Sequence, residues 1–447
     1  MNNSDNTAAT AEVQPFVGQF AAKKDELPGA SLPWLAELRD AALQGFASRG
    51  FPTRRDESWK YTNLRPLARI PFAPAKRIEV GAAPVSVLPA ASRPYRVVIA
   101  NGRFSPERSD VDGVPAGVRL GSLADLLRNE PDLLKPWLGS TGQADDAPML
   151  ALNTAFMSDG MVLMLEEGMT LDRPVELIYL GTAGGEAAVA HPRSLIVARK
   201  GSTATVVEHH IGQGEGTYLS NGATEIFVGD DATLHHYKLQ EEGAETYHLH
   251  ANRIHVGTAA VYDNFVVSLG GRLARNQIDV EIRGERADVR LNGAYIARGR
   301  QHLDHTSRID HLAPNSISRQ VYKGVLDDRA RGVFQGHIVV AREAQKTDGH
   351  QLNRALMLSD GAEIDSKPML EIYADDVKCS HGATAGDLEK NALFYLRARG
   401  IPEAEARGLL IAAFLGEVID DLPVPEVREV FRARVERQLF SQIEEHA

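Results

Sequence analysis

Glycine returns at a fixed spacing in the middle of the chain, and this spacing restricts the fold more than any other feature. Gly229, Gly243, Gly257 and Gly271 are each separated by 14 residues. A longer phrase, glycine with alanine three residues later, recurs at about twice this spacing, as Gly201…Ala204, Gly229…Ala232, Gly257…Ala260 and Gly284…Ala287. Stacked coils require such a period, because each coil buries its apolar face only against its neighbours. The sequence therefore predicts a β-helix, with either one or two coils in each long period.

Strand-like alternation surrounds this repeat. From about residue 161 the chain consists of short alternating runs separated by Gly, Asp and Asn; Ile278, Val280 and Ile282, for example, alternate with charged residues. A β-sandwich whose turn glycines recur by coincidence is the alternative, since turn glycines occur in any all-β domain. The half-period of 14 residues favours the solenoid.

Helical patterns occupy both ends of the chain. Residues 1 to about 30 show no clear period, and a helix is expected after Ser31 as cap and Pro33 as first-turn proline, ending before Gly50. Between residues 96 and 150 short strand-like and helix-like pieces alternate. We expect a helical or mixed N-terminal domain over residues 1–150.

Beyond Asp387 the apolar period becomes helical again. Thr384 and Asp387 form a candidate capping box, and Pro402 and Pro423 divide the remaining chain into three expected helices. The last of them carries an apolar stripe that must pack on a surface. We therefore expect a β-helix core over residues 151–385 and a helical C-terminal domain over residues 386–447.

Charge and composition exclude several partners and environments. The net charge is −11 and no long Lys/Arg block is present, so we expect no nucleic-acid partner. The N-terminus lacks the basic and apolar regions of a signal peptide, and the longest strongly apolar stretch, Leu409 to Leu415, is too short to span a bilayer. These features predict a cytoplasmic protein without a membrane segment. The single cysteine, Cys379, excludes an internal disulfide and a metal site of four cysteines from one chain.

Cys379 and His381 are the most suggestive pair for metal chemistry. If the segment around them is extended, side chains two residues apart share a face, so a sulfur and an imidazole donor project together. Both donors suit iron or zinc. The alternative is structural, because a lone cysteine is usually a small buried hydrophobe and a lone histidine is usually hydrogen-bonded. Two ligands cannot close a four-coordinate site, which suggests that a second chain shares it.

Other kinds of site are weaker. His248 and His250 share a strand face and resemble part of a cupin metal site, which makes a cupin-like metalloenzyme one alternative function; histidines that only pack between coils are the other interpretation. In the adjacent pairs His209-His210 and His235-His236 the two rings should face opposite ways. A carbohydrate-binding or lyase β-helix lacks support, since aromatics are 6% and not clustered in the repeat. No GxxxxGK[ST], GxGxxG or GxSxG motif occurs, so no catalytic or cofactor-binding residue is assigned.

Two separate segments resemble one family. Near the N-terminus the phrase Trp59-Lys60-Tyr61-Thr62-Asn63-Leu64 is similar to the W-[KR]-Y-T-x-L segment of the SufB/SufD family. The denser match covers residues 330 to 420; it includes Phe334-Gln335-Gly336, Gln351-Leu352-Asn353, Leu370 to Val377, Cys379 to Gly386 and Phe394 to Ile401. The form C-S-H-G-A-T-A-G and the single cysteine resemble the SufD branch, because SufB chains are usually longer and richer in cysteine.

The resemblance implies a fold and a role. It implies a right-handed parallel β-helix between helical terminal domains, in a chain that is mainly β with α-helical ends. It also implies a scaffold for iron-sulfur cluster assembly that is not an enzyme itself. The β-helix would pair with SufB, and the ATPase SufC would dock on the C-terminal helices and supply ATP hydrolysis. Without partners, the chain would be able to self-pair through the same β-helix edge.

The resemblance also assigns the site residues. Carried over by position, His381 and Cys379 would face SufB at the place where a nascent cluster forms, and His381 is the stronger candidate. A cluster needs about four ligands, so SufB would supply the remainder and the cluster would be bound transiently. Whether a flavin (FAD) associates with the complex stays open, as do the recipient proteins.

Overall fold

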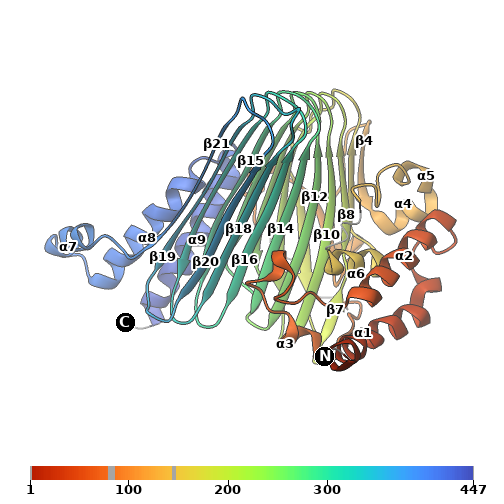
Figure 1. Cartoon of the computed structure of the whole chain (residues 1–447), viewed down its shortest axis with the longest axis horizontal. Coiled ribbons are helices and arrows are strands. Elements are labelled where there is room, and N and C mark those ends of the chain that lie inside the picture. Colours follow the sequence, from red (N-terminus) through yellow and green to blue (C-terminus); the bar gives the residue numbers. More distant parts are fainter. Residues whose placement is uncertain (1–2, 79–85, 143–146, 446–447) are drawn as a thin grey trace.

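Two β-sheets face each other through the centre of the molecule and form the walls of a solenoid of about 8 turns (Figure 1). The structure, a computed structural model, describes residues 3–78, 86–142 and 147–445. Successive strands alternate between the sheets, and every neighbouring pair from β8 to β20 and from β6 to β21 is parallel. The predicted β-helix is confirmed.

Sheet A, the 11-stranded sheet, ends with β20 on one side and β4 on the other. Its strands are β4 (Val118–Ser122), β5 (Met161–Leu165), β8 (Arg193–Ala198), β10 (Tyr218–Val228), β12 (Thr246–Val256), β14 (Leu273–Ile282), β16 (His302–His311), β18 (Arg331–Val340) and β20 (Glu363–Ile372), with β7 (Ala188–Ala190) beside β10 and β1 (Ala73–Pro74) beside β7.

Sheet B, the 10-stranded sheet, ends with β21 and β3. Its strands are β2 (Tyr95–Ala100), β3 (Arg103–Phe104), β6 (Val175–Gly181), β9 (Thr203–Gly212), β11 (Thr233–Glu241), β13 (Val261–Ser268), β15 (Asp288–Ala297), β17 (Ile317–Leu326), β19 (Asp348–Met357) and β21 (Lys378–Gly386).

One coil contains one strand of each sheet. Tyr218 of β10 lies beside Thr246 of β12, which is one long period later in the sequence and one coil further along the solenoid. The long period is therefore one coil of two strands, and half of it is one strand with its turn. Ala232, Ala260 and Ala287 of the repeated phrase are fully buried between the sheets, as predicted.

The glycines of the phrase are needed because coils approach closely at this corner. A Cβ on Gly284 would lie 2.0 Å from the backbone nitrogen of Thr258 in the preceding coil. The first phrase, however, is out of register with the other three. Thr203 pairs with Thr233, so Ala204 aligns with Leu234 rather than with Ala232. Gly201 has a φ of +66°, a left-handed conformation that glycine adopts without steric strain.

Helices cover the outer faces of both sheets. Against sheet A pack α1 (Asn3–Lys23), α2 (Pro33–Arg49), α3 (Arg65–Ala68) and α6 (Pro148–Phe156), while α4 (Leu123–Asn129) and α5 (Pro131–Leu134) lie near the first coils. Sheet B is covered by α8 (Glu403–Ile419) and α9 (Pro425–Glu445), and α7 (Lys390–Ala398) projects away from the solenoid (Figure 1). The rings of Phe265 on β13 and Phe431 on α9 are 6.0 Å apart and belong to this second core.

The helix predictions are confirmed in part. The expected helix after Ser31 is α2, but its cap is Leu32 and no side chain caps it, so the Ser31 cap is wrong. The three helices beyond Asp387 are α7, α8 and α9. Thr384 lies in β21, so the capping box with Asp387 is also wrong. The boundaries near residues 150 and 385 stay predictions, and β2, β3 and β4 from the first part pair with solenoid strands.

The two ends of the solenoid differ. At the N-terminal end, β3 and β4 run antiparallel to β2 and β5 and finish the two sheets. At the other end, β20 and β21 each have a neighbouring strand on one side only among the described residues. Ile372 and Tyr373 at this open end are 39% and 62% exposed.

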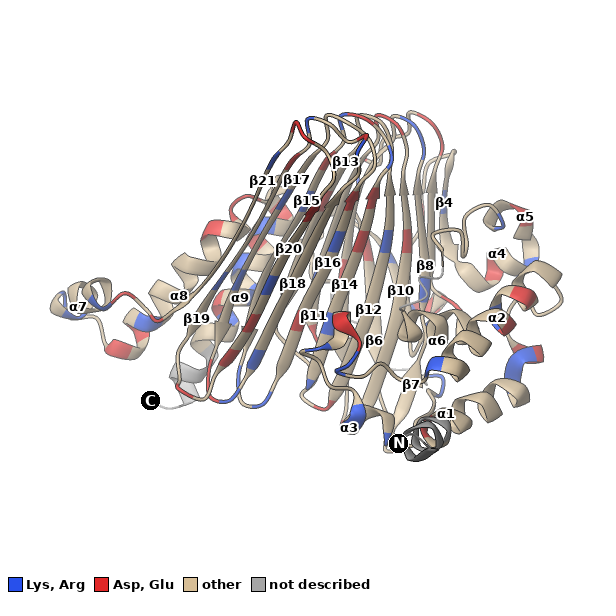
Figure 2. Cartoon of the chain, viewed as in Figure 1, with Lys and Arg blue, Asp and Glu red and all other residues tan. Residues whose placement is uncertain are grey.

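Charged residues of both signs are interspersed across the outer face of sheet A (Figure 2). Neighbours on this face form pairs such as Arg253 with Asp279, 3.3 Å apart, and Arg308 with Asp310, 2.9 Å apart. None of the helices in the described residues combines the length and the apolar character needed to cross a membrane.

Candidate functional site

Cys379 and His381 lie on β21, the last strand of sheet B. They pair with Gly349 and Gln351 of β19, both of which face the solenoid interior and are buried. In a parallel ladder paired residues point the same way, so Cys379 and His381 project from the same face of β21, toward the interior. Because no further coil covers them among the described residues, Cys379 is half-buried and His381 is exposed.

The thiol of Cys379 packs against the preceding coil. A Cβ on Gly349 would lie 3.6 Å from the Cys379 Sγ, and the apolar residues nearby include Ile338, Val340 and Leu370. Burial raises the pKa of the Cys379 thiol, and the charge of Asp348 adds to this effect. The thiol is therefore protonated at neutral pH, and it becomes a strong ligand only when a metal displaces its proton.

Beneath His381 a hydrogen bond joins the two sheets. The Gln351 side chain on β19 donates from Nε2 to the carbonyl oxygen of Met369 on β20, at 2.9 Å. His350, the neighbour of Gln351, faces outward and contacts Asp348 and Ser380. The open end thus offers one sulfur donor and one imidazole donor. Two donors are too few to complete a four-coordinate metal site.

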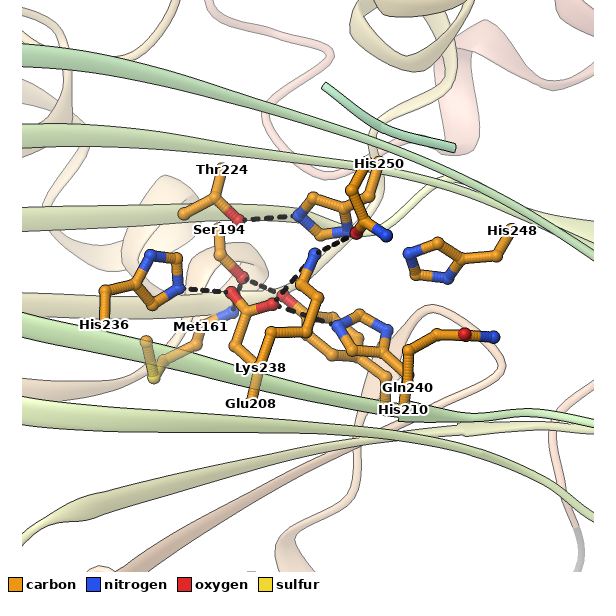
Figure 3. A network of polar contacts seen from close by, with 12 residues as sticks. Met161, Ser194, Glu208, His210, Thr224, His236, Lys238, Gln240, His248 and His250 are labelled. Carbon is orange, nitrogen blue, oxygen red and sulfur yellow. Dashed lines mark hydrogen bonds and ion pairs between the residues drawn. The ribbon is translucent and has the colours of Figure 1, made fainter. Parts of the chain in front are cut away.

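A second group of polar side chains fills the solenoid interior several coils earlier (Figure 3). Glu208 and His210 come from β9, His236 and Lys238 from β11, and His248 and His250 from β12. All six are at most 3% exposed. They point inward because alternate residues of each strand face the core, whereas His209 and His235 face outward and contact Glu241 and Asp263. The prediction that adjacent histidines face opposite ways is confirmed.

Glu208 is the centre of this group. Its carboxylate contacts His236 Nε2 and His210 Nε2, each at 2.9 Å, and the Lys238 Nζ at 3.4 Å. Burial alone would raise the pKa of Glu208, but the Lys238 ammonium and the two histidine contacts hold it well below its usual value. Burial lowers the pKa of Lys238, and Glu208 opposes that effect. The result is an ion pair enclosed in the core.

His248 and His250, the two histidines that the sequence favoured, lie together with His210, which comes from one of the weaker adjacent pairs. The ligand atoms of His210, His248 and His250 are all within 4.8 Å of one another. Burial lowers the pKa of His210 to about 4 and that of His250 well below its ordinary value, so both imidazoles are neutral at neutral pH. Glu242, in the loop after β11, lies with its Oε2 2.9 Å from His248 Nδ1.

Sequence reasoning missed Glu208, Lys238 and Glu242, and it ranked the pair that contains His210 below His248 and His250. The adjacent histidine pairs were the available signal, since one member of each pair must face inward. Grouping these residues required the exact pairing of strands in neighbouring coils, and that pairing is irregular between β9 and β11. Lys238 pairs with Glu208, whereas the long period would have placed Lys238 beside His210.

Comparison with known proteins matches nearly the whole chain to two domains of one family. The family described as "SUF system FeS cluster assembly, SufBD core domain" matches residues 179–414, and "SufBD protein N-terminal region" matches residues 10–177.

Individual relatives extend over the same range. The chain is 32% identical to "Iron-sulfur cluster assembly SufBD family protein slr0076" of Synechocystis, over 88% of this chain and 89% of the relative. It is 31% identical to the iron-sulfur cluster assembly protein SufD of Escherichia coli, over 89% and 91%. It is also 31% identical to the chloroplastic protein ABCI7 of Arabidopsis thaliana, over 94% and 90%.

Proposed function

This chain belongs to the SufBD family of the SUF system of iron-sulfur cluster assembly, and from that premise we propose that it is a non-enzymatic scaffold subunit of the SufD type. Its last coil would present His381 and Cys379 to a SufB partner, and a nascent cluster would form between the two chains as cargo. One observation carries this proposal: two soft donors project from the same face of β21, a terminal strand at the open end of the solenoid.

The open end supports pairing with another solenoid. Strands at a sheet edge present unpaired N–H and C=O groups, which are a template for pairing with a second chain. Both sheets end here, at β20 and β21, and exposed apolar side chains such as Tyr373 flank the edge. A SufB β-helix with its own open end would complete both sheets and exclude water from the donors between them.

The ligand count supports a shared and releasable cluster. Iron-sulfur clusters are held by about four ligands, mostly thiolates, and this end supplies one cysteine and one histidine. The partner would supply the rest. Because burial raises the pKa of the Cys379 thiol, protonation competes with the metal for this sulfur. A donor site of this kind releases its cluster more readily than four thiolates would.

We expect His381→Ala to lower cluster assembly in the complex by at least about tenfold, because even an outer-shell partner of a metal is worth about 10- to 100-fold in affinity. The measurement is co-expression with SufB and SufC, anaerobic reconstitution, and analysis of iron and sulfide per complex. His350→Ala is the matched control, since His350 lies on the neighbouring strand and faces outward. Normal assembly by the His381 variant would place the cluster on SufB alone.

The C-terminal helices are the proposed docking surface for SufC, whose ATP hydrolysis would drive remodelling of the scaffold in the cytoplasm. Helices α8 and α9 bury apolar residues against sheet B, but no residue of α7 is buried. On α7, Phe394 is 74% exposed and Tyr395 is 57% exposed. Exposed aromatic pairs of this kind are frequent anchors of protein interfaces.

Phe394→Ser with Tyr395→Ser is therefore expected to weaken SufC binding by about tenfold or more, which corresponds to the loss of aromatic anchors worth about 1.4 kcal/mol or more in total. Titration calorimetry with purified SufC measures it. Leu312→Ser removes another exposed apolar side chain, 44% exposed, from a solenoid turn, and should leave the affinity unchanged. Equal affinity for all the variants would show that SufC docks elsewhere.

A further inference from the structure

Three imidazoles converge inside the solenoid, far along the chain from the proposed cluster site. His210 projects from sheet B, and His248 and His250 project from sheet A, so the two walls of the solenoid contribute to one group (Figure 3). All three side chains are at most 3% exposed, and their ligand atoms lie within 4.8 Å of one another. The rings of His210 and His248 are edge-to-face with centroids 4.8 Å apart.

Each of these histidines has one ring nitrogen beside an oxygen and another without a hydrogen bond. Glu208 contacts His210 Nε2 at 2.9 Å, and the Thr224 hydroxyl contacts His250 Nε2 at 3.0 Å. The Nδ1 atoms of His210 and His250 have no hydrogen-bond partner. Neither ring nitrogen of His248 makes a well-aligned hydrogen bond, although Glu242 lies close to its Nδ1. Buried polar atoms are rarely left unpaired, so these nitrogens require an explanation.

We propose that His210, His248 and His250 bind one divalent first-row transition ion, such as Fe²⁺ or Zn²⁺, through His210 Nδ1, His248 Nε2 and His250 Nδ1. A ligating histidine almost always has its second ring nitrogen held by a carboxylate or another oxygen, as Glu208 and Thr224 do here. Glu242, with its Oε2 2.9 Å from His248 Nδ1, would play that part for His248 once the ring is aligned by the ion. Imidazole ligands suit Fe²⁺ and Zn²⁺ alike.

The three ligand nitrogens would have to move closer together to bind one ion. A metal at about 2.0–2.1 Å from each nitrogen in tetrahedral geometry places the nitrogens about 3.4 Å apart. The nitrogens, which lie within 4.8 Å of one another, would therefore have to approach by up to about 1.4 Å when an ion binds. Three protein ligands leave a fourth coordination position free.

The charges around the group also favour a cation. Glu208 and Glu242 each contribute a negative charge, and Lys238 contributes one positive charge. An ion would replace unpaired buried nitrogens by coordinate bonds and would join sheet A to sheet B at this level of the solenoid.

The enclosure of the site determines how the ion enters. With all three histidines buried, an ion reaches them while these coils fold, or during a rare opening between the sheets. The ion is therefore resident rather than cargo, and it is independent of the donors at the open end. This inference goes beyond the proposed scaffold function and does not rest on it.

The test uses the full chain expressed alone in medium supplemented with iron, in a second preparation with zinc, purified anaerobically and dialysed against EDTA. Metal content is measured by mass spectrometry. We expect close to one ion per chain in the wild type, and at least a tenfold loss in His248→Gln. His305→Gln is the matched control, because His305 is also buried in the interior with both ring nitrogens unpaired but is not part of the group. It should keep the ion.

Two results would overturn the proposal: wild-type chain that retains no ion in either preparation, or retention by His248→Gln equal to that of the control. If His248→Gln fails to fold, X-ray absorption on the metal-loaded wild type decides the question. A first shell dominated by imidazole nitrogens supports the site, and a shell containing sulfur assigns the ion to Cys379 instead. His381→Ala should leave the metal content unchanged, which separates this site from the cluster site.

Discussion

Glu208→Gln is expected to lower the free energy of unfolding of the isolated chain by about 3–5 kcal/mol. The Glu208 carboxylate is fully buried and balances the charge of Lys238, 3.4 Å away and 1% exposed. Removing one member of a buried ion pair leaves the other charge without compensation in a medium that solvates it poorly. Unfolding by guanidinium chloride, followed by circular dichroism, measures the change.

The double variant Glu208→Gln with Lys238→Met is the informative control. Removing both charges leaves no uncompensated ion in the core, which avoids the main cost of the single variant. We therefore expect the double variant to recover most of the stability that the single variant loses. A single variant within about 1 kcal/mol of wild type would show that the pair is not charged in the folded chain.

The second large effect is expected at Asp304, on the outer face of β16, where the N-terminal segment crosses sheet A. Asp304 is fully buried and contacts the Arg275 guanidinium and the Thr62 hydroxyl, while Arg275 lies under the Trp59 ring with 4.0 Å to its centroid. Asp304→Ala leaves the Arg275 charge buried without a counter-ion. The expected loss of stability is about 3–5 kcal/mol.

Hydrogen exchange adds a local test of the same variant. Because Thr62 and Trp59 are attached to sheet A through Asp304 and Arg275, the segment around them should exchange faster in Asp304→Ala. Asp310→Ala is the matched control, since Asp310 is on the same strand but its partner Arg308 is 46% exposed. Exposed pairs are worth about 0–1 kcal/mol, so this control should stay near wild type. If both variants lose the same stability, the buried contact between Asp304 and Arg275 contributes no more than the exposed pair.

The architecture was predictable because it is periodic. Coil stacking forces glycine and alanine to recur at one corner, and both the β-helix and the Gly229, Gly257 and Gly284 turns could be inferred from that spacing. Register was not predictable, because the pairing of Thr203 with Thr233 is two residues longer than the glycine spacing around it. Helix α1 was missed because residues 1 to about 30 showed no clear period, although Val13, Phe16 and Phe20 are buried at helical spacing.

The family motif near the N-terminus gains a physical explanation from the fold. Nothing in the local sequence explained why Trp59, Thr62 and Leu64 should occur together. The structure shows that they fasten one segment to sheet A: Trp59 covers Arg275, Thr62 contacts Asp304, and Leu64 is fully buried. Contacts between residues so far apart in the sequence cannot be obtained from local patterns.

Strand alternation was enough to place Cys379 and His381 on one face, because a period of two needs no tertiary information. It was not enough to show that this face is the interior of the last coil, which depends on pairing with β19. The interior group around Glu208 required the register of two sheets, and so it emerged only from the structure.

The difference between the two ends of the solenoid limits how large an assembly can grow. A rod with two equivalent open ends would add subunits head to tail and polymerise into a fibre. Here β3 and β4 run antiparallel to their neighbours at one end, so among the described residues only β20 and β21 present the parallel edges that a further coil would continue. If two chains join through these ends, neither chain is left with an open end. If the chain pairs as proposed, elongation would therefore stop at two solenoids, and the junction would be enclosed in the middle of the particle.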